Sequence, residues 1–195
     1  MRPSARTIRG IVGIAFVIGI AVLALKSSVQ GTTQARHEES FTPNSVSVYF
    51  SPKGGCTEAV VRELDHAQKS IRVQAYSFTS APIAKALVEA KRRGLDVEII
   101  LDRSQRSERY SSADFGAHAG IPTFIDAVHA IAHNKIIIVD GEVVLTGSFN
   151  FTKAAEEKNA ENLLVIHDKA LAAKYMENWE HHRGHSEGYA GRSGP

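Results

Sequence analysis

The chain has 195 residues, 43% of them hydrophobic and 23% charged, which fits one globular domain with extensions and excludes a low-complexity or disordered protein. Its single cysteine, Cys56, excludes an intrachain disulfide framework. The formal net charge of +2 arises in the first 26 residues, because without their four bases 19 bases face 21 acids; this excludes bulk positive charge as the basis of nucleic-acid binding and leaves only a local patch.

The N-terminus has the pattern of an export signal. Three arginines precede an unbroken run of fifteen apolar and glycine residues, Ile11–Leu25. The run matches the hydrophobic region of a secretory signal and is short for a membrane span, which needs about 20 residues. Because the cleavage pattern is weak, residues 1–26 are interpreted as a signal peptide or an uncleaved signal-anchor. Basic residues favour the cytoplasmic side, so we expect an exported protein that is periplasmic, secreted or membrane-anchored.

A polar linker is predicted at residues 27–44, followed by one folded domain at residues 45–183. The first half of this domain alternates short apolar runs with amphipathic stretches. The alternation predicts strands at 46–50, 71–78 and 95–101, and helices at 57–69 and 82–93. Strand–helix alternation favours parallel pairing. The prediction is therefore an α/β fold with a mixed, largely parallel β-sheet and helices on both faces.

The second half of the domain contains a hairpin between short helices and strands. Helices are predicted at 113–119 and 152–158, strands at 121–125 and 162–166, and a final helix from the cap Asp168 to about Arg183. The remaining residues, 184–195, are rich in glycine and serine and are predicted to form a flexible tail.

The hairpin lies in the stretch His133–Asn150, which reads H-N-K-I-I-I-V-D-G-E-V-V-L-T-G-S-F-N. The apolar, β-branched run 136–139 is typical of a buried strand. Asp140-Gly141 is a hairpin signal, so residues 143–146 are predicted to form the return strand.

Four polar side chains are expected to meet at the open end of this hairpin. His133 and Lys135 are two residues apart before the first strand, and Ser148 and Asn150 have the same spacing after the second. Residues at i and i+2 share a face, and the start of one antiparallel strand lies beside the end of the other. The convergence brings together a nucleophile and three donors for an anion, without a metal-ligand cluster. Attack on a phosphoryl centre suits this set.

Glu161 stands at the start of the strand predicted after the hairpin, eleven residues beyond Asn150. A strand there would lie next to the hairpin and bring the carboxylate near His133. A carboxylate beside an imidazole fixes its tautomer and supports positive charge on the ring. The alternative interpretation is a solvated glutamate at a strand end.

The pattern H-x-K-x4-D-x6-G-S-x-N resembles the phospholipase D superfamily at every defining position: His133, Lys135, Asp140, Gly147, Ser148 and Asn150. The segments 74–79, 86–91 and 146–156 are also similar to the small, secreted, single-motif bacterial endonucleases of that superfamily. The likeness covers roughly Val46 to Arg183. It implies a phospholipase D-like α/β/α sandwich and a non-specific endonuclease that cuts DNA and RNA without a metal or other cofactor. It also implies a role for Glu161, because related nucleases carry a glutamate at this spacing.

In-line displacement at phosphorus requires an acid on the side opposite the nucleophile. One histidine cannot occupy both sides, and the chain has one complete motif, so we expect a homodimer with a shared site; the short members of the family are also dimers. One His133 would form a phosphohistidine, and the partner subunit's His133 would protonate the leaving oxygen. Two coupled histidines predict a bell-shaped dependence of activity on pH.

The other site residues have assigned parts in this hypothesis. Lys135, Ser148 and Asn150 are expected to hold the phosphate oxygens. Arg103, with Arg106 and Arg109, follows the third predicted strand and is a candidate contact for a polyanion backbone. Asp140 belongs to the motif and to the candidate catalytic set, although its place at the turn favours a structural role.

Two alternatives stay open at this point. A phospholipase D-type phospholipid hydrolase would suit a membrane anchor and the slightly acidic body of the protein. A non-catalytic phosphate-binding adaptor is the other alternative, but it has no need of the intact His133, Lys135 and Asn150.

Several other features are interpreted as structural. The partial repeat His167-Asp168-Lys169 is expected to cap a helix, because no G-S-x-N follows it. His181, His182 and His185 are interpreted as a cationic helix terminus rather than a metal site. Cys56 is interpreted as a small buried hydrophobic residue. No metal ligand is therefore predicted.

Overall fold

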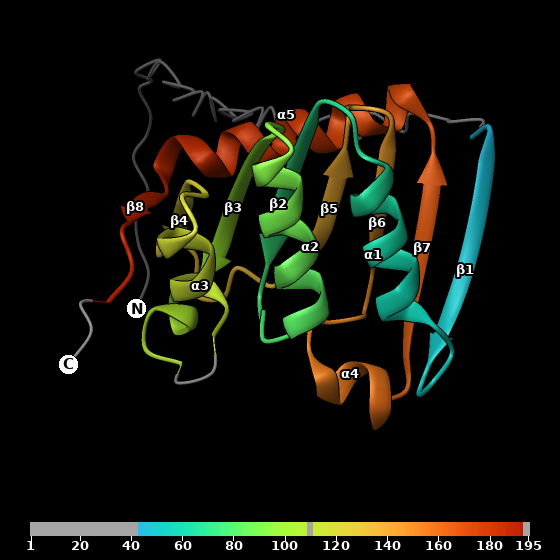
Figure 1. Ribbon diagram of the computed structural model, residues 1–195, viewed down its shortest axis with the longest axis horizontal. Coiled ribbons are helices and arrows are strands. Elements are labelled where there is room, and N and C mark those ends of the chain that lie inside the picture. The colour runs from blue at the N-terminus through green and yellow to red at the C-terminus, as the bar shows by residue number, and fades with distance from the viewer. Residues whose placement is uncertain (1–42, 109–110, 193–195) are drawn as a thin grey trace, which may run out of the picture. The chain divides into compact units, whose positions relative to one another are not determined.

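The computed structural model describes residues 43–108 and 111–192 (Figure 1). The predicted export signal at 1–26, and all of the predicted linker except its last two residues, lie outside these ranges. Within the described ranges, the helices are too short or too polar to cross a membrane.

One mixed sheet forms the centre of the domain (Figure 1). Within residues 43–108 and 111–192 it has eight strands, in the order β1-β7-β6-β5-β2-β3-β4-β8. They are β1 (Ser45–Ser51), β2 (Ser70–Ala75), β3 (Asp96–Asp102), β4 (Thr123–Asp126), β5 (Lys135–Val139), β6 (Val143–Gly147), β7 (Glu161–His167) and β8 (Glu187–Tyr189).

The prediction of a largely parallel sheet was wrong, because most neighbouring strands are antiparallel. Among the strands of the described chain, only β2–β3 and β3–β4 pair in parallel, through the crossovers that carry α2 (Ala81–Arg92) and α3 (Ala113–His118). After β4, the chain returns to the other side of β2 and continues as the antiparallel run β5, β6, β7. The first strand, β1, then pairs with β7 and not with β2. Strand–helix alternation sets local crossovers, but it does not choose the edge at which a strand joins.

Helices cover both faces of the sheet. On one face lie α1 (Cys56–His66), α2 and α3, and on the other lies the long α5 (Lys169–His185) (Figure 1). The shorter α4 (Lys153–Glu157) and the 3-10 turn η1 (Arg103–Arg106) connect strands. A large apolar cluster fills the space under α1 and α2, and a smaller one packs Ala172 and Trp179 of α5 against β3, β5 and β6. Trp179 also donates a hydrogen bond from Nε1 to Val73 O, at 3.0 Å.

The antiparallel run places the ends of several neighbouring strands on the same side of the sheet, where the chain enters and leaves it. Lys135 begins β5 beside Ala75, the last residue of β2. Gly147 ends β6 beside β7, whose first residue is Glu161. The Asp140-Gly141 turn lies at the opposite ends of the same two strands, where β5 finishes and β6 begins. Residues before β5, after β6 and at the start of β7 are therefore neighbours.

The prediction of a flexible tail from residue 184 was wrong as far as Tyr189. Helix α5 extends to His185, and β8 then pairs antiparallel with β4. Tyr189 donates its hydroxyl hydrogen bond to Asp114 Oδ1 at 2.6 Å, and an ion pair of 2.7 Å joins Arg106 to Glu187. Local composition did not reveal this strand because polar side-chain contacts with distant residues hold it.

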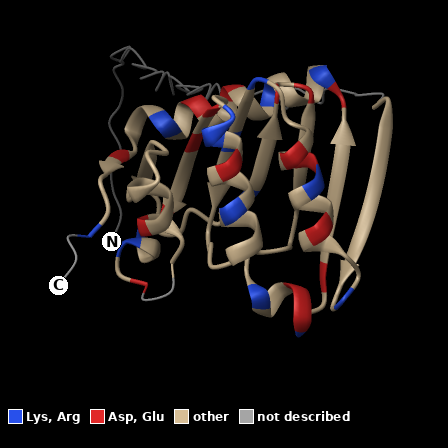
Figure 2. Ribbon diagram, in the orientation of Figure 1, with Lys and Arg blue, Asp and Glu red and all other residues tan. Residues whose placement is uncertain are grey.

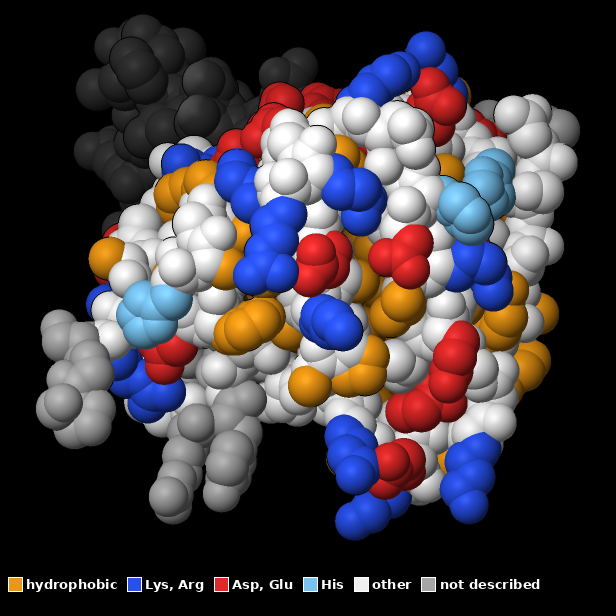
Figure 3. Space-filling model, viewed as in Figure 1, with side chains coloured by type: hydrophobic (Ala, Val, Ile, Leu, Met, Phe, Trp, Pro, Cys, Tyr) orange, Lys and Arg blue, Asp and Glu red, His pale blue; other side chains and the backbone are white. Residues whose placement is uncertain are grey.

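Charges of both signs are interspersed on the face formed by α1 and α2 (Figures 2 and 3). This distribution agrees with the near balance of bases and acids in the sequence outside the first 26 residues. This face therefore offers no uniform basic field that would attract a polyanion.

Candidate active site

A pocket of about 370 Å³ opens at the strand ends where β5 and β7 begin and β6 finishes. It is lined by His133, Lys135, Gly147, Ser148, Asn150 and Glu161. The structure thus brings together five of the side chains that the sequence predicted to act in catalysis. All of them come from one segment of the chain, residues 133–161.

Lys135 is the buried cation of this pocket. Its residue is only 6% exposed, and Nζ donates a hydrogen bond to His133 O at 2.8 Å. Nζ also lies 5.1 Å from the centroid of the Tyr76 ring, within the range of a cation–π contact. Burial lowers the pKa of the Lys135 ammonium, and the carboxylate of Glu161 acts in the opposite direction. A poorly solvated ammonium is well suited to hold an incoming phosphate oxygen.

His133 lies just before β5 with its side chain exposed at the mouth of the pocket. Its ring packs against Tyr76, with centroids 4.6 Å apart and planes inclined by 56°. Among the described residues, no hydrogen bond occupies either ring nitrogen, so the ring is available to a substrate. The sequence interpretation missed Tyr76, which directly follows β2 and whose N–H donates to Asn134 O at 2.8 Å. Its position at the end of the neighbouring strand is the signal that could have identified it.

Ser148 is held by Asn162, a residue that the sequence interpretation also missed. Ser148 Oγ accepts hydrogen bonds from Asn162 N at 3.1 Å and from Asn162 Nδ2 at 3.3 Å. Because the oxygen accepts both bonds, the hydroxyl proton remains available to donate into the pocket. Gly147 makes this approach possible: it has φ +152°, and a Cβ there would lie 2.3 Å from Asn162 O.

Glu161 lines the pocket, but its predicted contact with His133 is not made. Within the described part of the chain, its carboxylate accepts a hydrogen bond from Asn159 Nδ2 at 3.1 Å and none from an imidazole. Its electrostatic influence falls on Lys135 instead. Asn150 lies beside them, and its buried Oδ1 has no hydrogen-bond partner among the described residues.

Asp140 belongs to the sequence motif but lies away from the pocket, which corrects its place in the candidate catalytic set. Its carboxylate accepts hydrogen bonds from Gln68 N at 2.8 Å, Lys69 N at 2.7 Å and Ser70 N at 2.9 Å. Strand β5 separates it from Lys135 by roughly 16 Å, at about 3.3 Å per residue. Asp140 therefore fastens the β5–β6 turn to the loop before β2 and is structural.

The predicted substrate contact Arg103 does not line the pocket. It is exposed in η1, directly after β3, at the same edge of the sheet. Strand β2 lies between β3 and β5, so the end of β3, where Arg103 follows, is roughly 10 Å from Lys135. Arg106 is paired with Glu187, and Arg109 lies outside the described residues. Only a substrate longer than one phosphate group would reach Arg103 from the pocket.

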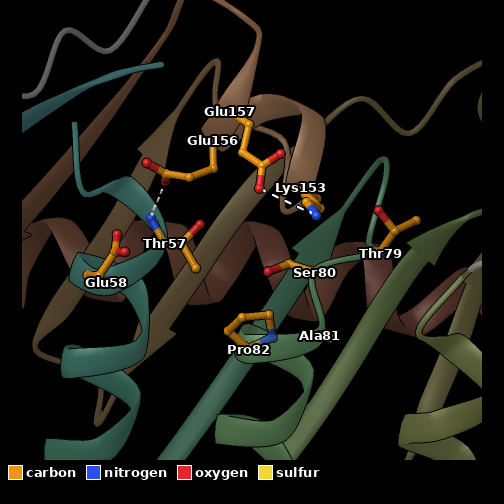
Figure 4. A pocket seen from close by; sticks show the side chains of 9 residues that line it. All are labelled: Thr57, Glu58, Thr79, Ser80, Ala81, Pro82, Lys153, Glu156 and Glu157. Atoms are coloured by element: carbon orange, nitrogen blue, oxygen red, sulfur yellow. Dashed lines mark hydrogen bonds and ion pairs between the residues drawn. The ribbon is translucent and has the colours of Figure 1, made fainter. Parts of the chain in front are cut away.

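A second pocket, of about 400 Å³, lies between the N-terminal turns of α1 and α2 and the short α4 (Figure 4). Glu156 crosses it to accept hydrogen bonds from Thr57 N at 2.7 Å and Gly55 N at 3.3 Å. These bonds satisfy the start of α1, so the carboxylate has a structural partner. Burial, with help from Glu156, raises the pKa of the adjacent Cys56 thiol to about 11, which excludes it as a thiolate nucleophile.

Comparisons with known proteins point to one family. Residues 60–183 match the family model described as "Cardiolipin synthase, PLD-like domain". The chain is 39% identical over 183 residues to a phospholipase D of Rickettsia conorii, covering 86% of this chain and 92% of that one. Nuc of Salmonella typhimurium, a phospholipase D family member, superposes with a TM-score of 0.73 at 45% identity, covering 76% of this chain and 99% of that one. NucT of Helicobacter pylori shares the fold, with a TM-score of 0.68 at 23% identity, covering 74% and 99%.

Proposed function

The chain belongs to the phospholipase D superfamily and is a phosphodiester hydrolase, and on this premise we propose that it is a non-specific endonuclease that cleaves DNA and RNA without a catalytic metal. The observation that carries the proposal is the pocket in which an unpaired imidazole faces three anion-binding side chains. The choice of nucleic acid is supported by the likeness of residues 74–79, 86–91 and 146–156 to small bacterial endonucleases of this superfamily. The 45% identity to Nuc, 99% of which is covered, agrees with that choice.

The reaction has two displacements at phosphorus. In the first, a ring nitrogen of His133 forms a bond to phosphorus while the bond to the leaving oxygen breaks, which gives a phosphohistidine. The partner subunit's His133, in its protonated form, gives its proton to the leaving oxygen. In the second, that same imidazole takes a proton from water, the water oxygen attacks phosphorus, and the bond to His133 breaks.

The remaining pocket residues stabilise the charge that develops on the phosphoryl oxygens. The Lys135 ammonium, the free hydroxyl proton of Ser148 and the amide of Asn150 are all donors at the pocket wall. Their positions are fixed in advance by burial, by the contact with His133 O and by Asn162. Donors that need no rearrangement during the reaction contribute most to transition-state stabilisation.

We propose a homodimer because the mechanism needs two histidines and each chain supplies one. An apolar surface beside the pocket supports this assembly. Val46, Val48 and Phe50 alternate along the edge strand β1 and are 52%, 52% and 63% exposed. Their partners on β7 include Leu164 and Ile166, so the apolar surface spans two strands. It ends next to the pair Ser51–Glu161, at the rim of the pocket, where a second copy would place its own His133 nearby.

The second candidate is a phospholipid hydrolase of the phospholipase D type. The description of the matching family model and the name of the Rickettsia relative both favour a lipid substrate. A retained anchor in residues 1–26 would also place the pocket at a membrane surface. In either case, we propose export to the periplasm or the exterior, directed by that segment.

A chelator-resistant cleavage assay separates the two candidates. The full chain, purified in mild detergent, is incubated in EDTA with plasmid DNA, with RNA, and with vesicles of phosphatidylcholine or cardiolipin. We expect degradation of both nucleic acids, a loss of at least about a thousandfold in His133→Ala, and normal activity in His66→Ala, an exposed histidine at the end of α1. Lipid turnover without cleavage of nucleic acid would overturn the nuclease proposal in favour of the alternative.

Mixed dimers test the shared site. Wild-type and His133→Ala chains are co-expressed in different ratios, and activity is plotted against the fraction of wild-type chains. If each site needs both histidines, activity follows the square of that fraction, because a mixed dimer has no complete site. A linear dependence would show that one chain suffices.

A further inference from the structure

A second group of polar side chains gathers at the end of β4, outside the pocket. Asp126 is the last residue of β4 and is fully buried. His129 follows it in the next loop, while His182 and His185 belong to the last turn of α5. One ligand atom from each of the four residues lies within 4.8 Å of every other. The sequence analysis interpreted His182 and His185 as part of a cationic helix terminus and did not connect them with Asp126, which is 56 residues away from His182.

The three imidazoles converge on the same carboxylate. His182 Nδ1 lies 2.8 Å from Asp126 Oδ2, His129 Nδ1 lies 3.1 Å from it, and His185 Nε2 lies 3.4 Å from it. The ring centroids of these histidines are 4.9 to 5.3 Å apart. All three imidazoles thus lie within hydrogen-bonding distance of one carboxylate oxygen, and the Asp126 side chain that carries it is fully buried.

We propose that Asp126, His129, His182 and His185 bind one Zn²⁺ ion. Three imidazole nitrogens and one carboxylate oxygen form a donor set that zinc accepts in tetrahedral geometry. At zinc–ligand distances of about 2.0–2.1 Å, the edges of the tetrahedron are roughly 3.3 Å. The carboxylate–imidazole distances of 2.8 to 3.4 Å are already close to this value. Only the imidazoles need to adjust, and all three are partly exposed.

The site would be structural, because the protein supplies all four ligands and leaves no position for a substrate. It also lies away from the catalytic pocket: β4 is three strands from β5, roughly 14 Å across the sheet. Metal-free cleavage at His133 and a zinc ion at this site are thus compatible.

The ion would fasten the end of α5 to the end of β4 and to the loop that leads to His133. The same loop has a second anchor, because Ala132 N donates a hydrogen bond to Asp102 Oδ2 at 2.7 Å. With both ends of residues 126–132 held, the backbone reaches His133 in a fixed position. The zinc site would therefore act as a support for the nucleophile, with no contact to the substrate.

Metal analysis of the full chain tests the proposal. The protein is expressed in zinc-containing medium, purified in detergent through an affinity tag without histidine, and kept free of chelators. Elemental analysis is expected to give one zinc per chain. After removal of the metal with a strong chelator, addition of Co²⁺ should give the intense visible absorption of a tetrahedral site. Trace zinc together with a six-coordinate or absent Co²⁺ spectrum would overturn the proposal.

Histidine variants assign the ligands. His182→Ala and His185→Ala should each weaken Zn²⁺ binding by at least about tenfold, as measured by competition with a fluorescent chelator. The matched control is His181→Ala, because His181 is exposed on the same turn and only packs edge-on against both rings. Circular dichroism checks that each variant is folded. The Co²⁺ spectrum of the wild type tests the site even if a variant fails to fold. Unchanged zinc binding in folded His182→Ala would contradict the assignment.

Discussion

The ammonium nitrogen of Lys135 lies 2.8 Å from the backbone carbonyl oxygen of His133 and donates a hydrogen bond to it. The bond joins the residue that would bind the phosphate to the backbone of the residue that would attack it. The two residues are thus fixed to each other at the start of β5. The charge on Lys135 therefore influences both the binding of the phosphate and the position of His133.

The titration of Lys135 should depend on Glu161. Burial lowers the pKa of this lysine and the Glu161 carboxylate opposes that effect, so Glu161→Gln should lower the pKa further. NMR of the lysine side-chain nitrogen across alkaline pH measures the shift directly. Glu157→Gln removes a carboxylate that pairs with Lys153 and lines the other pocket, and should leave the pKa of Lys135 unchanged. A rise in the pKa of Lys135 in Glu161→Gln would contradict the prediction.

Gly147→Ala should destabilise the domain strongly. The new Cβ would lie 2.3 Å from Asn162 O, at a φ of +152° that L-residues rarely adopt, so we expect a loss of at least about 3 kcal/mol in the free energy of unfolding. Gly141→Ala is the matched control: it also has positive φ but open space around it, and should cost only about 1 kcal/mol. Urea titration compares the two. Equal losses would mean that the contact with Asn162 is not the constraint.

Asp140→Ala should reduce stability and leave catalysis nearly intact. The substitution leaves the N–H groups of Gln68, Lys69 and Ser70 without their acceptor, which should cost about 2 kcal/mol because two of them can turn to water. Below the melting temperature, kcat should stay within about a factor of two of wild type. A loss of activity comparable to that of His133→Ala, in folded protein, would return Asp140 to the catalytic set.

Asp114 should contribute to stability at neutral pH and lose that contribution in acid. Burial raises its pKa, but hydrogen bonds from Tyr189 and Arg192 outweigh it and hold the pKa at about 2, below the ordinary 3.8. The native state thus binds fewer protons than the unfolded state. The stabilisation is present above pH 3.8 and is lost as the pH falls to about 2. Asp114→Asn should flatten this part of the stability–pH curve, measured by urea titration; an unchanged slope would count against the assignment.

The sequence could predict what short-range rules control. The Asp140-Gly141 turn and the apolar run after Lys135 place the ends of one hairpin side by side, and the structure has that hairpin. The same i, i+2 reasoning brought His133, Lys135, Ser148 and Asn150 to one place, where they line a single pocket. Their roles in catalysis stay a prediction.

Features that depend on distant pairing could not be predicted in this way. The direction of β5 beside β2 follows from the route of the chain after β4, and no periodicity records it. Residue Asn162 supports Ser148 only because β6 and β7 are neighbours. His182 meets Asp126 because α5 crosses the back of the sheet. Each of these contacts joins segments that are far apart in the sequence, and local patterns hold no information on which distant segments meet.

The pairing of β1 with β7 has a consequence for the order of folding. Ser51 and Glu161 are 110 residues apart, so β1 obtains its partner only after β2 to β6 have been synthesised. Contacts of such separation form slowly. Until then Val46, Val48 and Phe50 belong to an unpaired strand that is prone to aggregation. A chain truncated before Glu161 would keep that strand unpaired and would also lack one wall of the pocket. The same strand, β7, therefore completes both the sheet and the pocket.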